Sequence, residues 1–165
     1  MITFKRISYK NFLSTGNQPI VVDLDMSQTT LVVGTNGSGK STLLDALCFV
    51  LFNRPFRIIK KEQMVNTIND GECVVEVDFI VGTIPYKVRR SIKPNNFEIF
   101  KNGKKLNQDA NNIDYQKYLE QNIMKLNYRS FIQVVLLGSS SYEPFMKMKP
   151  RYRREVVEEI LDIRV

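Results

Sequence analysis

The 165-residue sequence contains no histidine, no tryptophan and only two cysteines, Cys48 and Cys73. Structural zinc sites in proteins take four ligands, almost always cysteine or histidine. Two isolated cysteines without any histidine cannot supply such a set, so an ordinary zinc site is excluded. Both cysteines lie inside apolar runs, and we therefore predict that they are reduced thiols buried in the core.

Long apolar runs are also missing. No stretch approaches the roughly 18 to 20 residues of a membrane span. Residues 1–6 do not have the charged-then-apolar layout of a secretion signal, so we predict a cytoplasmic protein with no membrane partner. The formal charge is +7. Excess Lys and Arg favours polyanionic partners such as nucleotides or nucleic acid, although the same excess also serves solubility.

Residues 34–41 match the phosphate-binding loop, a glycine, four free positions and then Gly-Lys-Ser, without substitution. Glycines let successive backbone N–H groups converge on phosphate oxygens. In such a loop Lys40 reaches the β- and γ-phosphates and the Ser41 hydroxyl binds Mg²⁺. We therefore predict ATP and Mg²⁺ as cofactors, held by Gly34, Asn36, Gly37, Ser38, Gly39, Lys40, Ser41 and Thr42.

The flanks of this loop agree with the motif. Residues 29–33 are apolar and β-branched, which predicts a buried parallel strand, and residues 41–52 predict a buried helix. A helix N-terminus adds its dipole to an anion site. The alternative is a glycine-rich surface turn before a core helix, but strand, loop and helix together favour the phosphate-binding loop.

The remaining chain predicts a mixed α/β (α+β) fold. Alternating residues predict strands over 2–12, 20–24, 73–81, 86–92 and 97–101, the last running into the hairpin signal Asn102-Gly103. The strands over 73–81, 86–92 and 97–101 should form an antiparallel meander of three or four strands with one solvated face. A polar helix is predicted over residues 112–124, a further strand over 131–137 and a final helix from about residue 150.

Four sequence motifs resemble one family of P-loop ATPases. They are Lys10-Asn11-Phe12, the loop itself, Leu44-Asp45-Ala46 and Phe131-Ile132-Gln133. Together they are similar to the N-terminal lobe of the SMC-like ABC ATPases that serve double-strand-break repair nucleases, the SbcC-like class. Within that class the chain looks closest to the branch found in T-even-type phages, and the similarity covers essentially its whole length.

The resemblance implies an ATPase head built from two lobes that are separated in sequence by a long coiled coil. Residues 1–150 would be the N-terminal lobe and 151–165 the start of the coiled-coil helix. The implied partners are the C-terminal lobe, a second head, a nuclease subunit of the SbcD-like class and double-stranded DNA. The implied location is the cytoplasm of a bacterium or of a phage-infected host.

Gln133 falls where the family's Q-loop glutamine contacts Mg²⁺ and the attacking water. The resemblance therefore makes Lys40 and Gln133 catalytic residues and Ser41 and Gln133 metal ligands. One departure is that many relatives carry Arg after Lys-Asn-Phe, whereas this chain has Leu13. Any nucleotide contact of that Arg cannot be transferred here.

Several parts of an ABC-type hydrolytic site are absent from the sequence. Asp23 and Asp25 follow an apolar run that imitates a Walker B strand, but they precede the P-loop, so we predict that they face outward. Residues 137–140 are a poor imitation of the signature loop, and no switch histidine exists. ATP hydrolysis is thus expected to require the C-terminal lobe and head dimerisation.

Basic residues of the meander fit sequence-independent contacts with DNA phosphates, although a solvated strand face is an equally simple interpretation. The predicted DNA-contacting residues are Lys87, Arg89, Lys101, Lys104 and Lys105. Two other functions stay open: a small-molecule or nucleoside kinase, which shares the P-loop, and an SMC-type DNA-clamping protein without a nuclease. The position of Gln133 and the lack of an Arg-rich lid favour the repair ATPase over the kinase.

Overall fold

The computed structural model of the chain describes residues 1–107, 112–136 and 144–161. Two compact units are present, Met1–Asp109 and Ala110–Val165. None of the helices in the described residues has the length and apolar content that a membrane span requires.

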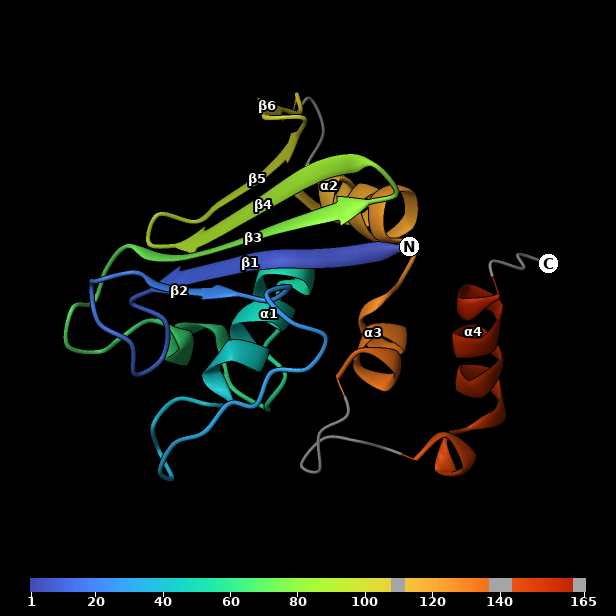
Figure 1. Ribbon diagram of the computed structural model, residues 1–165, viewed down its shortest axis with the longest axis horizontal. Coiled ribbons are helices and arrows are strands. Elements are labelled where there is room, and N and C mark those ends of the chain that lie inside the picture. Colours follow the sequence, from blue (N-terminus) through green and yellow to red (C-terminus); the bar gives the residue numbers. More distant parts are fainter. Residues whose placement is uncertain (108–111, 137–143, 162–165) are drawn as a thin grey trace. The chain divides into compact units, whose positions relative to one another are not determined.

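The first unit is built on one antiparallel sheet (Figure 1). Its strand order is β2-β1-β3-β4-β5-β6, and every neighbouring pair is antiparallel. The predicted meander is therefore confirmed. The strands are β1 (Ile2–Lys10), β2 (Ile20–Asp23), β3 (Cys73–Val81), β4 (Ile84–Ile92), β5 (Asn96–Lys101) and β6 (Lys104–Lys105).

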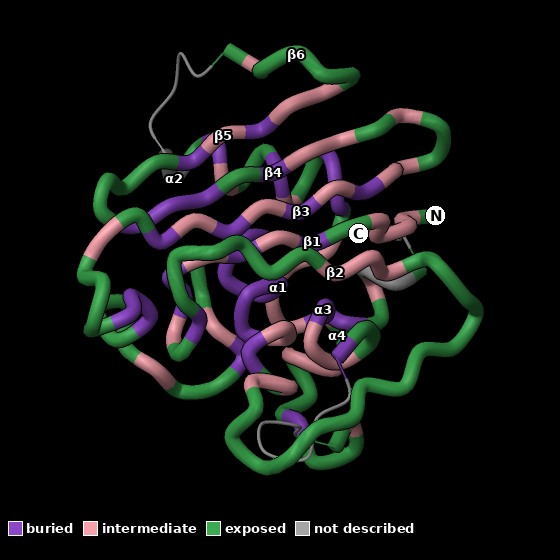
Figure 2. The backbone as a smooth tube through the Cα atoms, turned by 60° about the vertical axis from the view of Figure 1, so that its left-hand side comes forward, coloured by how far each residue is buried: buried purple, intermediate pink, exposed green. Residues whose placement is uncertain are grey.

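One face of the sheet is covered by helix α1 (Thr42–Phe52), which packs on β3 and β4. Figure 2 shows this helix buried almost throughout. Val75 and Val77 of β3 are fully buried, as alternation requires for the face that meets the helix. At the far end of β1, Phe12 stacks on Phe49 of α1 with ring centroids 5.6 Å apart. This packing holds the C-terminal half of α1 against the sheet.

The ends of these elements follow local backbone chemistry. Asn102 and Gly103 both have positive φ, 51° and 75°, which is the type I′ hairpin geometry that the sequence predicts. Helix α1 ends at Asn53, whose φ is 57°. The buried Arg90 side chain donates from Nε to the Val50 carbonyl over 3.1 Å and lies 3.7 Å above the Phe97 ring. A cation at a helix C-terminus is favourable, so Arg90 stabilises the last turn of α1.

The predicted strand over residues 29–33 is wrong. These residues belong to none of the six strands, and Leu31, Val32 and Val33 are 84%, 51% and 81% exposed. A parallel strand needs a hydrogen-bonding neighbour and cover on both faces. The segment has neither here, since it pairs with no strand of the sheet and its side chains are exposed. The segment is left as an exposed apolar stretch before the P-loop.

The second unit is helical. It contains α2 (Asn112–Tyr118), the π-helix η2 (Leu119–Met124), α3 (Tyr128–Val134), the short 3₁₀-helix η3 (Phe145–Lys147) and α4 (Pro150–Ile160). The helices predicted over 112–124 and from residue 150 are thus confirmed. Glu155 of α4 accepts a hydrogen bond from Asn127 Nδ2 over 2.9 Å, and the Arg129 guanidinium lies 3.5 Å above the Tyr152 ring. These contacts join α3 to α4.

The predicted strand over 131–137 is also wrong, because its described part lies mainly in α3. The Asn127 side chain accepts from the Ser130 N–H over 2.9 Å and so caps the helix. A short apolar run cannot by itself distinguish a strand from a helix. Asn127, an N-cap residue four positions before Phe131, was the local signal that favours a helix over a strand. Residues 137–140, the imitation of a signature loop, lie outside the described residues.

Candidate nucleotide-binding site

The P-loop has the backbone that its glycines predict. Gly37 and Gly39 adopt φ values of 85° and 90°, which side-chain-bearing residues rarely adopt. A Cβ at Gly34 would lie 2.5 Å from Ser38 Oγ, so a larger residue there would displace the Ser38 side chain. The loop thus has two positions, Gly37 and Gly39, at which a side-chain-bearing residue would strain the backbone.

The loop leads directly into the N-terminus of α1. The Thr42 N–H donates to the Gly39 carbonyl over 3.0 Å, and the Ser41 side chain makes no capping hydrogen bond. The Ser41 hydroxyl therefore stays available to a ligand at the start of the helix. Unpaired N–H groups and the helix dipole make this end of α1 suited to an anion.

Lys40 folds back over the loop that precedes it. Its Nζ donates to the Gly34 carbonyl over 2.6 Å and to the Thr35 carbonyl over 2.8 Å. Both acceptors belong to the loop, so the ammonium is held beside the backbone turn that is predicted to bind phosphate. A phosphate oxygen is a stronger acceptor than a carbonyl and would draw the same ammonium to it.

A pocket of about 560 Å³ opens beside the P-loop. Ligand pockets for small molecules typically measure roughly 300 to 1,000 Å³. Most of the predicted nucleotide-binding residues line it: Asn36, Gly37, Gly39, Lys40, Ser41 and Thr42. Gly34 and Ser38 do not line it and instead contact each other inside the loop.

The pocket also has a wall that the sequence did not predict. We call this the far wall; it consists of Leu13, Ser14, Arg57, Ile59, Gln63, Val65 and Thr67. These residues come from the turn after β1 and from the connection between α1 and β3. No motif marks them, because they come from two segments that only the folded chain brings together. Leu13 was the one hint, since the family resemblance implies an arginine at this position.

Arg57 is fixed in the far wall by a buried carboxylate. Asp45 of α1 is fully buried, and it accepts from the Arg57 backbone N–H over 2.9 Å and from Arg57 Nε over 2.7 Å. Arg57 Nη2 lies 2.5 Å from Asp45 Oδ2, the same oxygen that accepts from Nε. Charge-assisted pairing of this kind satisfies a buried acidic group. It explains why the otherwise apolar α1 carries one charged residue.

Three other residues singled out in the sequence, Gln133, Asp23 and Asp25, lie away from the P-loop in sequence. Gln133 lies half-buried in α3 of the second unit, so its proximity to Ser41 stays a prediction. Asp23 and Asp25 face outward as predicted, since Arg6 Nε donates to Asp23 over 2.6 Å and Lys5 pairs with Asp25.

The two cysteines are free, buried thiols, which confirms the prediction for them. Burial raises the pKa of Cys73 to about 12 and that of Cys48 still further from its ordinary value. Both thiols therefore stay protonated and unreactive at neutral pH. Across the described residues there is no group of three or more Cys, Asp or Glu side chains that could hold a metal ion.

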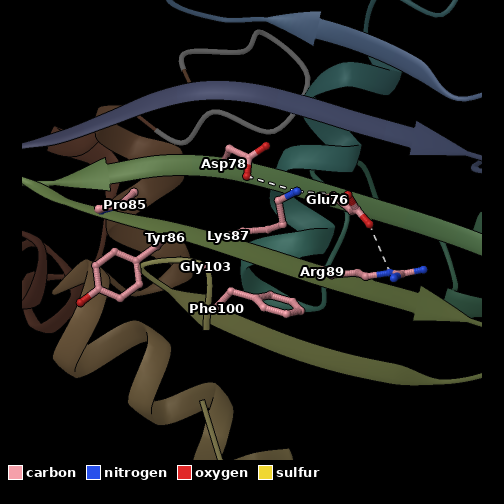
Figure 3. Close-up of a pocket in the computed structure, with 8 residues that line it drawn as sticks. All are labelled: Glu76, Asp78, Pro85, Tyr86, Lys87, Arg89, Phe100 and Gly103. Atoms are coloured by element: carbon pink, nitrogen blue, oxygen red, sulfur yellow. Dashed lines mark ion pairs between the residues drawn. The ribbon is translucent and has the colours of Figure 1, made fainter. Parts of the chain in front are cut away.

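The predicted DNA residues Lys87 and Arg89 share one face of β4, as alternation requires, and both face acidic residues of β3 (Figure 3). Arg89 Nε lies 3.2 Å from Glu76 Oε1, and Lys87 Nζ lies 3.6 Å from Asp78 Oδ1. They border an open hollow of about 420 Å³. The charge of this face is thus largely balanced within the sheet.

The remaining basic residues of the meander are divided between the two faces. Lys105 pairs across from Phe100 on the same face as Lys87, and its Nζ donates to Glu98 over 2.6 Å, which lowers the pKa of that carboxyl. Lys101 and Lys104 pair with each other in register and lie on the opposite face. The five predicted residues therefore do not form one continuous patch.

The fold and the P-loop together define the class of this protein. A family model described as an AAA domain matches residues 6–164, and the chain belongs to this family. Among curated proteins it is similar to exonuclease subunit 2 of Enterobacteria phage T4, with 43% identity over 158 residues, and to exonuclease subunit 2 of Escherichia phage RB69, with 42% identity over 165 residues. The first alignment covers 96% of this chain and the second 99%, but they cover only 28% and 29% of the relatives.

More distant relatives fit the same pattern. The DNA double-strand break repair Rad50 ATPase of Thermoplasma volcanium is 28% identical over 96% of this chain and 18% of its own length. Two solved Smc head domains share the fold. That of Pyrococcus furiosus, bound to the C-terminal domain of ScpA, has a TM-score of 0.64 at 22% identity and covers 97% of this chain and 42% of its own. That of Pyrococcus yayanosii has a TM-score of 0.60 at 25% identity, with 99% and 33% covered. The predicted resemblance to SMC-like ATPases and their phage branch is confirmed.

Proposed function

We propose that this chain is the nucleotide-binding N-terminal lobe of the ATPase subunit of a DNA double-strand-break repair and recombination nuclease. ATP-driven head dimerisation would control DNA binding and a partner nuclease of the SbcD-like class. One observation carries the proposal: an intact P-loop borders a pocket in a chain that is 43% identical, over 96% of its length, to a phage exonuclease subunit.

The residues of the site fit Mg²⁺-bound ATP. The P-loop N–H groups and Lys40 would hold the phosphates, and the Ser41 hydroxyl would bind the metal ion. Gln133 is proposed as a second metal ligand that orients the attacking water. Bound Mg²⁺ supplies charge stabilisation to the transferring phosphoryl group.

The exposed apolar stretch before the P-loop supports docking of a second lobe. Leu31 and Val33 are 84% and 81% exposed, and the nearby edge strand β2 exposes Ile20 and Val21. The chain spans less than a third of the length of its phage relatives. We infer that the C-terminal lobe of the same ATPase adds strands beside residues 29–33 and covers these side chains.

Replacing Leu31 and Val33 together by aspartate tests this docking. Burial of an aliphatic side chain contributes about 1.5 to 3 kcal/mol, so the double variant should bind a separately expressed C-terminal lobe at least about tenfold more weakly. Its own melting temperature should stay close to that of the parent, because both side chains are exposed. Calorimetric titration measures the affinity, with Ile58→Asp as an exposed control. Unchanged affinity in the double variant would place the docking surface elsewhere.

We also propose that the sheet face that carries Lys87 and Arg89 binds DNA, and the ion pairs on this face allow a test. Neutralising the acidic partners with Glu76→Gln and Asp78→Asn removes the ion pairs that Lys87 and Arg89 make with β3. Duplex binding should then strengthen for unrelated sequences alike, and its dependence on salt should steepen by roughly one unit per released cation. Reversing the cations with Lys87→Glu and Arg89→Glu should have the opposite effect on both quantities.

Fluorescence anisotropy over a series of salt concentrations measures both pairs of variants. Glu98→Gln, which releases Lys105 on the same face, should change DNA binding in the same direction as the first pair. If all variants share the salt slope of the parent, these residues form an ordinary solvated face and DNA contacts lie elsewhere.

A further inference from the structure

A cluster of asparagines lies behind the far wall of the nucleotide pocket. It joins the turn after β1, residues 10–17, to the segment 64–69 before β3. Asn11 and Asn66 are 2% and 7% exposed, so both are buried polar residues that must be satisfied internally.

Asn11 occupies the centre of this cluster. Its φ is 51°, a left-handed conformation that asparagine tolerates better than most residues. Its Nδ2 donates to Asn17 Oδ1 over 3.1 Å, which closes its own turn. Its Oδ1 accepts from Asn69 Nδ2 over 2.7 Å, and its carbonyl accepts from the Asn66 N–H over 2.9 Å. Asn11 therefore binds the second segment through both side chain and backbone.

Asn66 satisfies both ends of its amide. Its Nδ2 donates to the Thr15 carbonyl over 3.0 Å, across to the turn after β1. Its Oδ1 accepts from the Ile68 and Asn69 N–H groups over 2.9 and 3.1 Å, which shapes its own segment. A single side chain thus fixes the 66–69 turn and joins it to the other segment.

These bonds set the position of the far wall. The Leu13 N–H donates to the Met64 carbonyl over 2.7 Å, and Phe12 forms an antiparallel bridge with Val65. Leu13 is held at a φ of 54°, which is unusual for this residue type. In the second segment Val65 and Thr67, on either side of Asn66, line the pocket. Asn66 itself faces the cluster behind it.

The two halves of the pocket differ in chemistry. The P-loop half offers N–H groups and the Lys40 ammonium, which suit phosphate. The far wall offers apolar Leu13, Ile59 and Val65 beside the uncharged polar Ser14, Gln63 and Thr67, with Arg57 as its one cation. Apolar surface with a few polar groups suits a flat base and the hydroxyls of a sugar.

We propose that Asn66, supported by Asn11 and Asn69, is a positioning residue for the base and ribose of the nucleotide. It acts through the far wall and touches neither the phosphates nor the P-loop. The inference rests on the proposed nucleotide-binding function and assigns a separate half of the site to the nucleoside.

The test compares two ligands that share the phosphates and differ in the nucleoside. Calorimetry measures the affinity of the parent, Asn66→Ala and Asn69→Ala for Mg²⁺-bound ATP and for Mg²⁺-bound tripolyphosphate. Asn66→Ala should bind ATP about tenfold more weakly, the effect of losing roughly one buried hydrogen-bonded anchor. Its affinity for tripolyphosphate should change less than about twofold, the scale of a surface substitution.

Two further variants keep the test decisive. Asn69→Ala removes only the hydrogen bond to Asn11, so it should weaken ATP binding selectively but by a smaller factor. This variant replaces Asn66→Ala in the test if Asn66→Ala does not fold. Asn95→Ala, which removes an exposed amide that accepts from Lys61, is the control and should bind both ligands as the parent does.

Each other outcome overturns a distinct statement. Equal loss of both ligands in Asn66→Ala and Asn69→Ala would make the cluster merely structural, and unchanged ATP affinity in both would remove its role altogether. A parent that binds ATP but not tripolyphosphate would overturn the division of the pocket into two halves. A parent that binds neither ligand would overturn the proposed function itself.

Discussion

Lys40→Ala is expected to weaken ATP binding by roughly 2 to 4 kcal/mol, the range for a buried charge-assisted contact. The Lys40 ammonium already lies against the two P-loop carbonyls of Gly34 and Thr35. Bound phosphates would take over this cation in a partly enclosed pocket, where its charge counts for more than in water. Isothermal calorimetry with Mg²⁺-bound ATP measures the loss.

The control for this experiment is Lys117→Ala in α2, which removes an exposed lysine paired only loosely with Asp114. It should bind ATP like the parent. Thermal unfolding of Lys40→Ala should stay close to that of the parent, because the P-loop is largely exposed. Equal ATP affinity in Lys40→Ala and the parent would contradict the assignment of the loop.

The chain by itself is expected to show no ATP hydrolysis above background. Ser41 and Gln133 are proposed to hold Mg²⁺ and orient water, but no Asp or Glu is among the described residues that line the pocket beside Ser41 to activate that water. Phosphoryl transfer depends almost entirely on positioning and charge stabilisation. A site without those parts should bind nucleotide and turn it over negligibly, as a phosphate-release assay would show.

Adding the C-terminal lobe as a separate polypeptide should restore hydrolysis. Because two heads are proposed to close around the nucleotides, the rate per head should rise with head concentration and then saturate. Gln133→Ala should lower the turnover of this reconstituted head far more than its ATP affinity, since the proposed role of Gln133 lies in the transition state. Vigorous hydrolysis by residues 1–165 alone, at a rate per chain independent of concentration, would instead favour a self-contained kinase or NTPase.

The features that could be predicted from the sequence are those that neighbouring residues encode. The P-loop is a contiguous motif whose backbone conformation is set within a few residues, as the positive φ values of Gly37 and Gly39 show. The Asn102-Gly103 hairpin and the alternation of β3 are likewise short-range signals. The predicted fold of the first unit, and half of its nucleotide pocket, came from such signals.

Tertiary structure alone decided which segments meet. Residues 29–33 have the composition of a buried strand, yet they pair with no strand of this sheet and are exposed, since a buried strand needs a hydrogen-bonded neighbour and cover on both faces. The pairing of Arg89 with Glu76 depended on the register of two strands, and the far wall depended on Asn66 reaching Thr15 across 51 positions of sequence. The sequence by itself determined the loop that would bind phosphate. The fold determined the far wall of the pocket opposite that loop, because packing and strand register select long-range partners and no local sequence pattern contains them.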